Sequence, residues 1–390
     1  MRRKIIFISL VILLALILSI PLVFADMNDV ENQLDESVTE ELSNLDLSQL
    51  NDIVDNLGED ERALFKSSTF LDKVRALLDG ENIDYSSFLS TIIHTFFDGI
   101  VKCLPLIISI IVISILCSIV SSLRSKVGEA SVEKIINFVC FITIVFMLFG
   151  AIINLSTSVS ECILNLKGQM DATFPIMLTL IASVGGVNSV GVFQPMLAIC
   201  SNLVVQVFSY FLLPLFGLIV VFCIIGQISD VKFDKIFSLF KSIFRWTSKG
   251  MFWAVSGVVV VGGAMAGAID NVSIKATRFA IKSSVPMVGG YISDGISLVA
   301  VSGVLIKNAV GIGGVVLAIG SIIFPIVSVL VFALGLKFAG SILQLASNNE
   351  IADFLFSLAK VVELLITILA GVGFMYLISL GILINTVNIL

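Results

Sequence analysis

Charged side chains are scarce in this chain of 390 residues. Aspartate, glutamate, lysine and arginine make up 13% of the residues and hydrophobic residues 57%, whereas soluble domains are roughly 25% charged. This composition excludes a water-soluble fold. Apolar stretches of about 20 residues, the length that crosses a bilayer core, recur from Pro105 to Leu390. The sequence predicts an all-α, multi-pass helical membrane protein with a small exported acidic helical region at its N-terminus.

Side chains that carry catalysis or bind metals are few as well. His94 is the only histidine and has no second ligand beside it in sequence, so an interfacial side chain is expected there. The chain has no P-loop, no dinucleotide-binding glycine motif and no H-E-x-x-H motif. We therefore expect no enzyme, no cofactor, no metal and no nucleic acid partner. Six widely spaced cysteines are expected to act as small apolar side chains: Cys103, Cys117, Cys140, Cys162, Cys200 and Cys223.

The first 25 residues have the pattern of a secretory signal. Three basic residues precede an apolar run at residues 5–20, which ends in Pro21 and the small-residue motif Val23-Phe24-Ala25. This favours cleavage after Ala25, and the alternative is an uncleaved first membrane helix. Both interpretations place the following residues outside the cytoplasm.

Residues 26–99 form an acidic head, with eighteen acidic residues against four basic ones. Apolar residues recur there at helical spacing in three runs, and the third run stops at Gly80. Two or three short amphipathic helices are therefore expected. About 70 residues is marginal for an independent core, so a partner or the membrane surface could complete their apolar faces. The alternative is a solvated spacer before the first membrane helix.

Residues 100–390 form the membrane body, for which we predict about seven spans, give or take one. The first two are expected at 100–121 and 135–153, joined by a charged loop that the positive-inside bias places in the cytoplasm. An outside patch follows at 161–171. Prolines and glycines then interrupt residues 173–226, which fit either one span with a re-entrant or broken helix or three spans. Later spans are expected at 251–269, to about 330, at 334–345 and at 361–384.

Residues 230–249 form a basic amphipathic segment between two membrane spans. Phenylalanines and isoleucines share one face of the expected helix, while four basic residues lie opposite. This pattern is typical of a cytoplasmic helix in the membrane interface. Its basic face is either a docking surface for a partner subunit or a plain topology anchor. The candidate docking residues are Lys235, Lys241, Arg245 and Lys249.

The most distinctive stretch lies between residues 270 and 314. Three basic residues at spacings of three and four are followed by a Pro-x-x-Gly-Gly motif that should break or start a helix. Asp294 then enters an apolar run, where a buried carboxylate is costly without a partner, and Lys307 is the candidate partner. Alternatively, Asp294 caps a helix at the membrane edge. The candidate functional residues are Lys275, Arg278, Lys282, Pro286, Gly289, Gly290, Asp294 and Lys307.

The orientation of this basic stripe raises a conflict. If residues 251–269 cross outward, the stripe lies outside the cytoplasm, against the usual charge bias. Either 251–269 is re-entrant, or the stripe faces an acidic partner in the exported compartment.

The segment from Thr277 to Gly314 resembles the stage III sporulation protein AE family. The resemblance rests on Thr277-Arg278-Phe279-Ala280-Ile281-Lys282, on Val285-Pro286-Met287-Val288-Gly289-Gly290, on Ser293-Asp294 and on Ile306-Lys307-Asn308-Ala309-Val310-Gly311. The overall layout is similar too, including Phe193-Gln194-Pro195 and Leu213-Pro214-Leu215.

This resemblance implies a permease-like subunit in the mother-cell membrane of a channel or secretion-type complex that joins mother cell and forespore. The acidic head would project between the two membranes, and sister subunits would supply rings and a cytoplasmic ATPase. Two other classes fit the residues: a stand-alone secondary transporter, which would need coupled charges at the midplane, and a structural scaffold.

Overall fold

The computed structural model describes most of the chain beyond the first 37 residues. The described residues are 38, 40–43, 45–58, 61–62, 65, 67–80, 85–125, 130–228, 233–284, 289–345 and 349–386. Side chains are described for these except at 85, 87, 121–125, 130–134, 137, 228, 234, 264, 266–284 and 289–300. The expected signal at 1–25 lies outside them.

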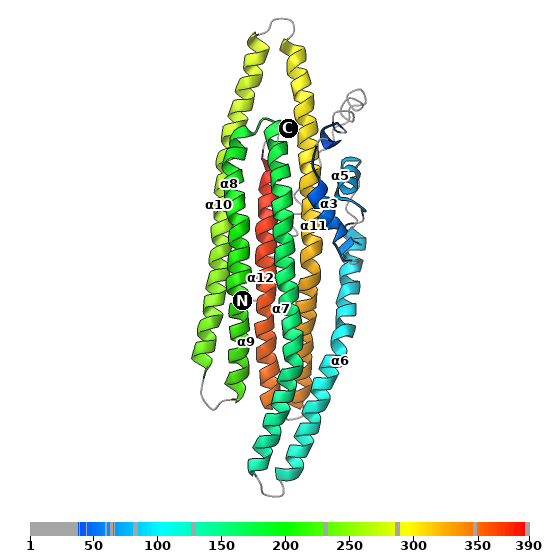
Figure 1. Cartoon of the computed structure of the whole chain (residues 1–390), viewed down its shortest axis with the longest axis vertical. Coiled ribbons are helices and arrows are strands. Elements are labelled where there is room, and N and C mark those ends of the chain that lie inside the picture. Colours follow the sequence, from blue (N-terminus) through cyan, green and yellow to red (C-terminus); the bar gives the residue numbers. More distant parts are fainter. Residues whose placement is uncertain are drawn as a thin grey trace.

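The described chain is a long bundle of helices (Figure 1). Helix α6 (Tyr85–Ser125) runs down the bundle, and α7 (Ala130–Ser183) returns along it. The chain descends through α8 (Val187–Val207), a π-helical turn η1 (Phe208–Leu212) and α9 (Leu213–Ile228). Helix α10 (Asp234–Ser284) ascends, α11 (Gly289–Leu345) descends, and α12 (Asn349–Asn385) ascends in the middle of the bundle.

Five helical stretches are long and apolar enough to cross a membrane by length and composition, and this confirms the multi-pass fold. Among the described residues they are Phe88–Val120, Phe138–Ser183, Val187–Gln227, Val301–Leu345 and Asn349–Asn385. Several exceed the bilayer: the 54 residues of α7 extend about 80 Å at 1.5 Å per residue, against roughly 30 Å of hydrocarbon. Parts of these helices therefore lie outside the hydrocarbon layer.

The helices are longer and less interrupted than the sequence suggested. Helix α7 passes unbroken through both the patch at 161–171 and Pro175, and it ends only before Gly185, whose φ of 98° favours glycine. Residues 187–227 form one helical pass, as in the first alternative for 173–226 and not the three-span one. Residues 334–345, expected as a separate span, are the end of α11.

Helix α10 joins two segments that the sequence had separated. The expected interfacial helix at 230–249 and the span at 251–269 are consecutive parts of one helix of 51 residues. A re-entrant 251–269 is therefore wrong, because the helix crosses the bundle from one end to the other (Figure 1). Its last turns extend beyond the end of α7 and the start of α8, at the same end of the bundle.

The acidic head folds against the bundle. Helix α3 (Ser48–Asp55) packs on α7 and helix α5 (Phe70–Leu78) on α11, beside the upper half of the bundle in Figure 1. Their buried apolar residues are those at helical spacing, namely Leu50, Val54, Phe70 and Val74. The prediction of short amphipathic helices is confirmed, and the chain's own membrane helices cover the apolar faces.

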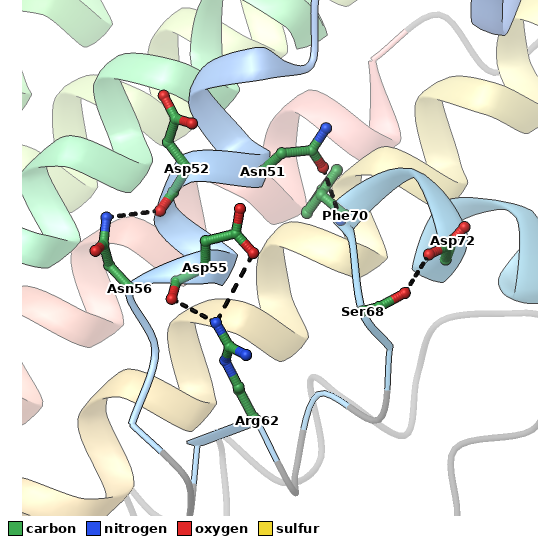
Figure 2. Close-up of polar contacts among 8 residues, drawn as sticks. All are labelled: Asn51, Asp52, Asp55, Asn56, Arg62, Ser68, Phe70 and Asp72. Atoms are coloured by element: carbon green, nitrogen blue, oxygen red, sulfur yellow. Dashed lines mark hydrogen bonds and ion pairs between the residues drawn. The ribbon is translucent and has the colours of Figure 1, made fainter.

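Polar contacts connect the segments of the head (Figure 2). The Asn51 side-chain oxygen accepts a hydrogen bond of 2.9 Å from the backbone N–H of Phe70, which ties α3 to the start of α5. Arg62 donates to the Asp55 carbonyl oxygen and lies 3.8 Å from its carboxylate. Thr69 caps α5 by accepting from the N–H of Asp72. These bonds fix how the two short helices meet.

Two cysteines differ from the sequence expectation. A disulfide joins Cys117 of α6 to Cys140 of α7. The prediction that all six cysteines act as small apolar side chains is therefore wrong for this pair, which helix pairing brings together from positions 23 residues apart. Cys162, Cys200 and Cys223 are buried and free, as expected.

Candidate functional site: polar groups within the helical bundle

Lys307 lies fully buried in α11. Its ammonium group donates a hydrogen bond to the backbone carbonyl oxygen of Thr386, just past the end of α12. The last carbonyl groups of a helix have no partner within the helix, and the helix dipole favours a cation beside them. The end of α12 therefore supplies part of what this buried cation needs.

Asp294, the expected partner of Lys307, lies on the same helix. Thirteen residues separate the two along α11, which corresponds to about 20 Å of helix. The structure therefore does not bring this pair together. Asn308, next to Lys307, has a buried side-chain oxygen with no hydrogen-bond partner.

A buried polar cluster connects α7 with α11 and α12. Gln169 donates to the Ser321 hydroxyl at 2.8 Å, and the Cys162 thiol donates to the Ser321 carbonyl oxygen at 3.3 Å. The hydroxyls of Thr173 and Tyr376 lie 3.1 Å apart, and the Tyr376 ring meets Phe174 edge to face. Polar side chains in a membrane helix core bond across helices because the alternative is an unpaired group in hydrocarbon. The cluster thus fixes the register of three helices.

Sequence reasoning did not find this cluster. Gln169 and Thr173 are four residues apart and share one face of α7, opposite the exposed side chain of Asp171. That spacing was a usable signal. Their partners on α11 and α12 are more than 150 residues away and follow only from the packing.

An ion pair crosses from α11 to α12 nearer the other end of the bundle. Lys337 binds Glu363, and their side chains remain 32% and 40% exposed. Both residues lie within stretches long and apolar enough to span a membrane. The structure thus pairs two charges that lie 26 residues apart in the sequence.

The structure describes the backbone of most candidate residues near the α10–α11 connection, but not their side chains. Lys275, Arg278 and Lys282 are helical residues in the last turns of α10. Gly289 and Gly290 open α11, as expected for a motif that starts a helix. Pro286 lies outside the described residues, as do the side chains of the others and of Asp294.

The four candidate docking residues lie in the first turns of α10. Lys235 and Lys249 are exposed and Lys241 and Arg245 half-buried. Part of the apolar face of this segment packs within the protein, since Phe240 stacks on Phe222 of α9 at 5.2 Å and Phe244 is fully buried. Ile236 and Ile243 of the same face remain 42% and 36% exposed.

Carboxylates of the head differ in their surroundings. Burial raises the pKa of Glu41, one of whose oxygens has no hydrogen-bond partner. Hydrogen bonds from Ser68 and then Thr69 lower the pKa of Asp72, and Ser48 lowers that of Asp46. Within the described residues, no three histidine, cysteine or acidic side chains are placed to hold a metal ion.

Long apolar helices, buried polar contacts between them and a head folded on their flank define a polytopic helical membrane protein. A family model for stage III sporulation protein AE matches residues 68–387, and this chain belongs to that family. It is 26% identical over 285 residues to the stage III sporulation protein AE of Bacillus subtilis (strain 168). This aligned region covers 72% of this chain and 71% of that protein. No solved structure matches the chain.

Proposed function

We propose that this chain is the permease-like membrane subunit of a channel or secretion-type complex that links mother cell and forespore. It sits in the mother-cell membrane, and its acidic head lies outside the cytoplasm. It acts without catalytic chemistry of its own, beside an ATPase and ring-forming subunits. Membership of a sporulation family by a multi-pass helical bundle is the observation that carries this proposal.

The arrangement of the bundle supports the proposed orientation. The head packs beside its upper half, while α6 ends and α10 begins at the lower end (Figure 1). Basic residues gather in the first turns of α10. A head outside and the basic first turns of α10 inside agree with the positive-inside bias. The stripe Lys275, Arg278 and Lys282 at the other end of α10 then lies outside, where it faces an acidic partner.

The first test is deletion of the gene in its host. Sporulating cells are followed with a membrane dye and with a reporter of late forespore transcription. We expect arrest after engulfment, with a small or collapsing forespore and a silent reporter, and recovery when the wild-type gene is restored. Normal spores would refute the proposal.

Point variants separate the subunit from a stand-alone transporter and from a scaffold. Asp294→Asn should abolish the function of a transporter that couples through this carboxylate, while the protein still accumulates. A scaffold should tolerate that change. For a docked subunit, charge reversal of both Lys235 and Arg245 should weaken recovery of partner subunits from detergent. Lys360→Glu, at an exposed lysine of α12, is the matched control, and equal recovery from both variants excludes docking through α10.

A further inference from the structure

The upper half of α7 exposes a polar face. Between Glu161 and Thr179, two of the exposed residues of α7 have larger apolar side chains, one leucine and one proline. Asp171 is 48% exposed, pairs with Lys167 and accepts a hydrogen bond from Ser201 of α8. The lower half of the same helix exposes large apolar side chains instead, namely Ile135, Phe138, Val139, Ile142, Phe146, Phe149 and Ile153. The outward face of α7 therefore changes character along its length.

The neighbouring helix α8 exposes amides together with Val192, Ile199 and Leu203, which are 39%, 59% and 44% exposed. Gln194, Asn202 and Gln206 are exposed, and Ala198 lies between them at helical spacing. A shallow surface hollow of about 320 Å³ is lined by Ala198, Ile199, Asn202, Leu203 and Gln206. We call the exposed polar residues of α7 and α8, together with this hollow, the α7–α8 face.

Helix α10 is apolar at the same depth. A methyl group added at Gly262 would meet Met196, and one at Gly263 would lie 3.6 Å from Phe193, so these parts of α10 and α8 are level. The two helices run in opposite directions (Figure 1). Every exposed residue with a described side chain from Trp253 to Met265 is apolar. Distance from the bilayer centre alone thus does not account for the polar α7–α8 face, because α10 shares its depth.

We propose that the α7–α8 face lines a water-filled passage, whereas the level part of α10 faces lipid. Exposed amides and carboxylates are costly against hydrocarbon and are found where a membrane protein borders water. The passage needs further chains to close it, since one helical hairpin borders water on one side only. Its neutral amides and the paired Lys167 and Asp171 suit polar solutes of low net charge. The inference rests on the proposed function only in assigning the passage to the sporulation assembly.

Level pairs of cysteine substitutions test this proposal. Because α8 and α10 run in opposite directions, Ala198, five residues after Phe193, lies at the depth of Val258, five residues before Gly263. In the same way, Asn202, nine residues after Phe193, lies at the depth of Ala254. All four residues are exposed. Each is replaced by cysteine in the full chain, in membranes from sporulating cells opened by freeze–thaw. A negatively charged methanethiosulfonate reagent is applied, and the unreacted thiols are counted by a gel-shift maleimide. The wild-type chain gives the background of the native cysteines.

We expect Ala198→Cys and Asn202→Cys to react at least about tenfold faster than Val258→Cys and Ala254→Cys, because a thiol must be hydrated to ionise and to meet a charged reagent. Fast reaction of all four places the whole level outside the bilayer and overturns the proposal. Slow reaction of all four means that lipid or a partner covers the face, and also overturns it. The ratio is independent of the deletion phenotype, so normal sporulation refutes the proposed function without changing this result.

Discussion

Docking of the head on the bundle depends on the absence of a side chain at Gly313. The Phe70 ring is fully buried, and a methyl group added at Gly313 would lie 3.1 Å from its Cζ atom. Such a distance already requires the ring to move. Gly313→Leu adds three further carbon atoms in the same direction and should displace Phe70 from α11.

The expected magnitude follows from the burial of one phenylalanine. Full burial of such a side chain stabilises by about 1.5–3 kcal/mol relative to exposure to water. Loss of about 1.5–3 kcal/mol raises the undocked fraction of the head by about 10- to 140-fold, at 1.4 kcal/mol per factor of ten. The bundle itself should remain folded, because its buried cores between α7, α11 and α12 do not depend on Phe70.

Limited proteolysis of the full chain in detergent measures this opening through cleavage within residues 67–80. Gly320→Ala is the matched control on the same helix, because nothing lies within 4 Å of an added methyl group there. Phe70→Ala combined with Gly313→Leu tests the pair, since the smaller side chain leaves room for the leucine. Unchanged cleavage in Gly313→Leu, or the same increase in Gly320→Ala, refutes the reasoning.

Three further results are expected. Lys337→Gln should lower the midpoint of thermal unfolding in detergent, because it removes the ion pair with Glu363. Reversing both charges, Lys337→Glu with Glu363→Lys, should restore most of that midpoint. A double reversal that unfolds at a lower temperature than the single variant contradicts the ion pair. Tyr376→Phe should destabilise the bundle by about 1–3 kcal/mol because it leaves the buried Thr173 hydroxyl unpaired, whereas Tyr376→Phe with Thr173→Val should be milder. The lowered pKa of Asp72 stabilises α5 above the ordinary carboxyl pKa, and this contribution disappears as pH falls through the folded-state pKa. The protection of α5 amides against exchange, corrected for the intrinsic exchange rate at each pH, should therefore fall in acid, and less so in Asp72→Asn.

Much of the fold follows from local pattern. The apolar runs predicted membrane helices, and the spacing of Leu50, Val54, Phe70 and Val74 predicted the buried faces of α3 and α5. The double glycine at 289 correctly indicated where a helix begins. These signals succeed because helical periodicity depends only on neighbouring residues.

Helix ends and breaks were harder to predict. The prolines and glycines of residues 173–226 suggested interruptions, yet Pro175 and Pro195 lie inside continuous helices. Neighbouring helices in a membrane protein can satisfy the backbone groups that a proline leaves free. The charged patch at 161–171 was predicted to lie outside the membrane, and it forms part of α7, whose 54 residues extend beyond the hydrocarbon layer.

The candidate site divides in the same way. Lys307 stood out as a charge in an apolar run, but its contact with the end of α12 came from tertiary packing. The assumed pairing with Asp294 failed because one continuous helix holds the two residues apart. The contacts of Ser321 and Tyr376 with α7 gave no signal within their own segments.

The sequence by itself determined that the protein is helical, multi-pass and acidic in its N-terminal region, since composition and periodicity act over a few turns of one helix. It also carried the motifs of its family. The tertiary structure decided which helices are continuous, what covers the head, which charges are paired and which face of α7 and α8 is polar at the depth where α10 is apolar. Those properties depend on contacts between residues far apart in the chain, where side-chain volume and desolvation, and not local preference, select the partner.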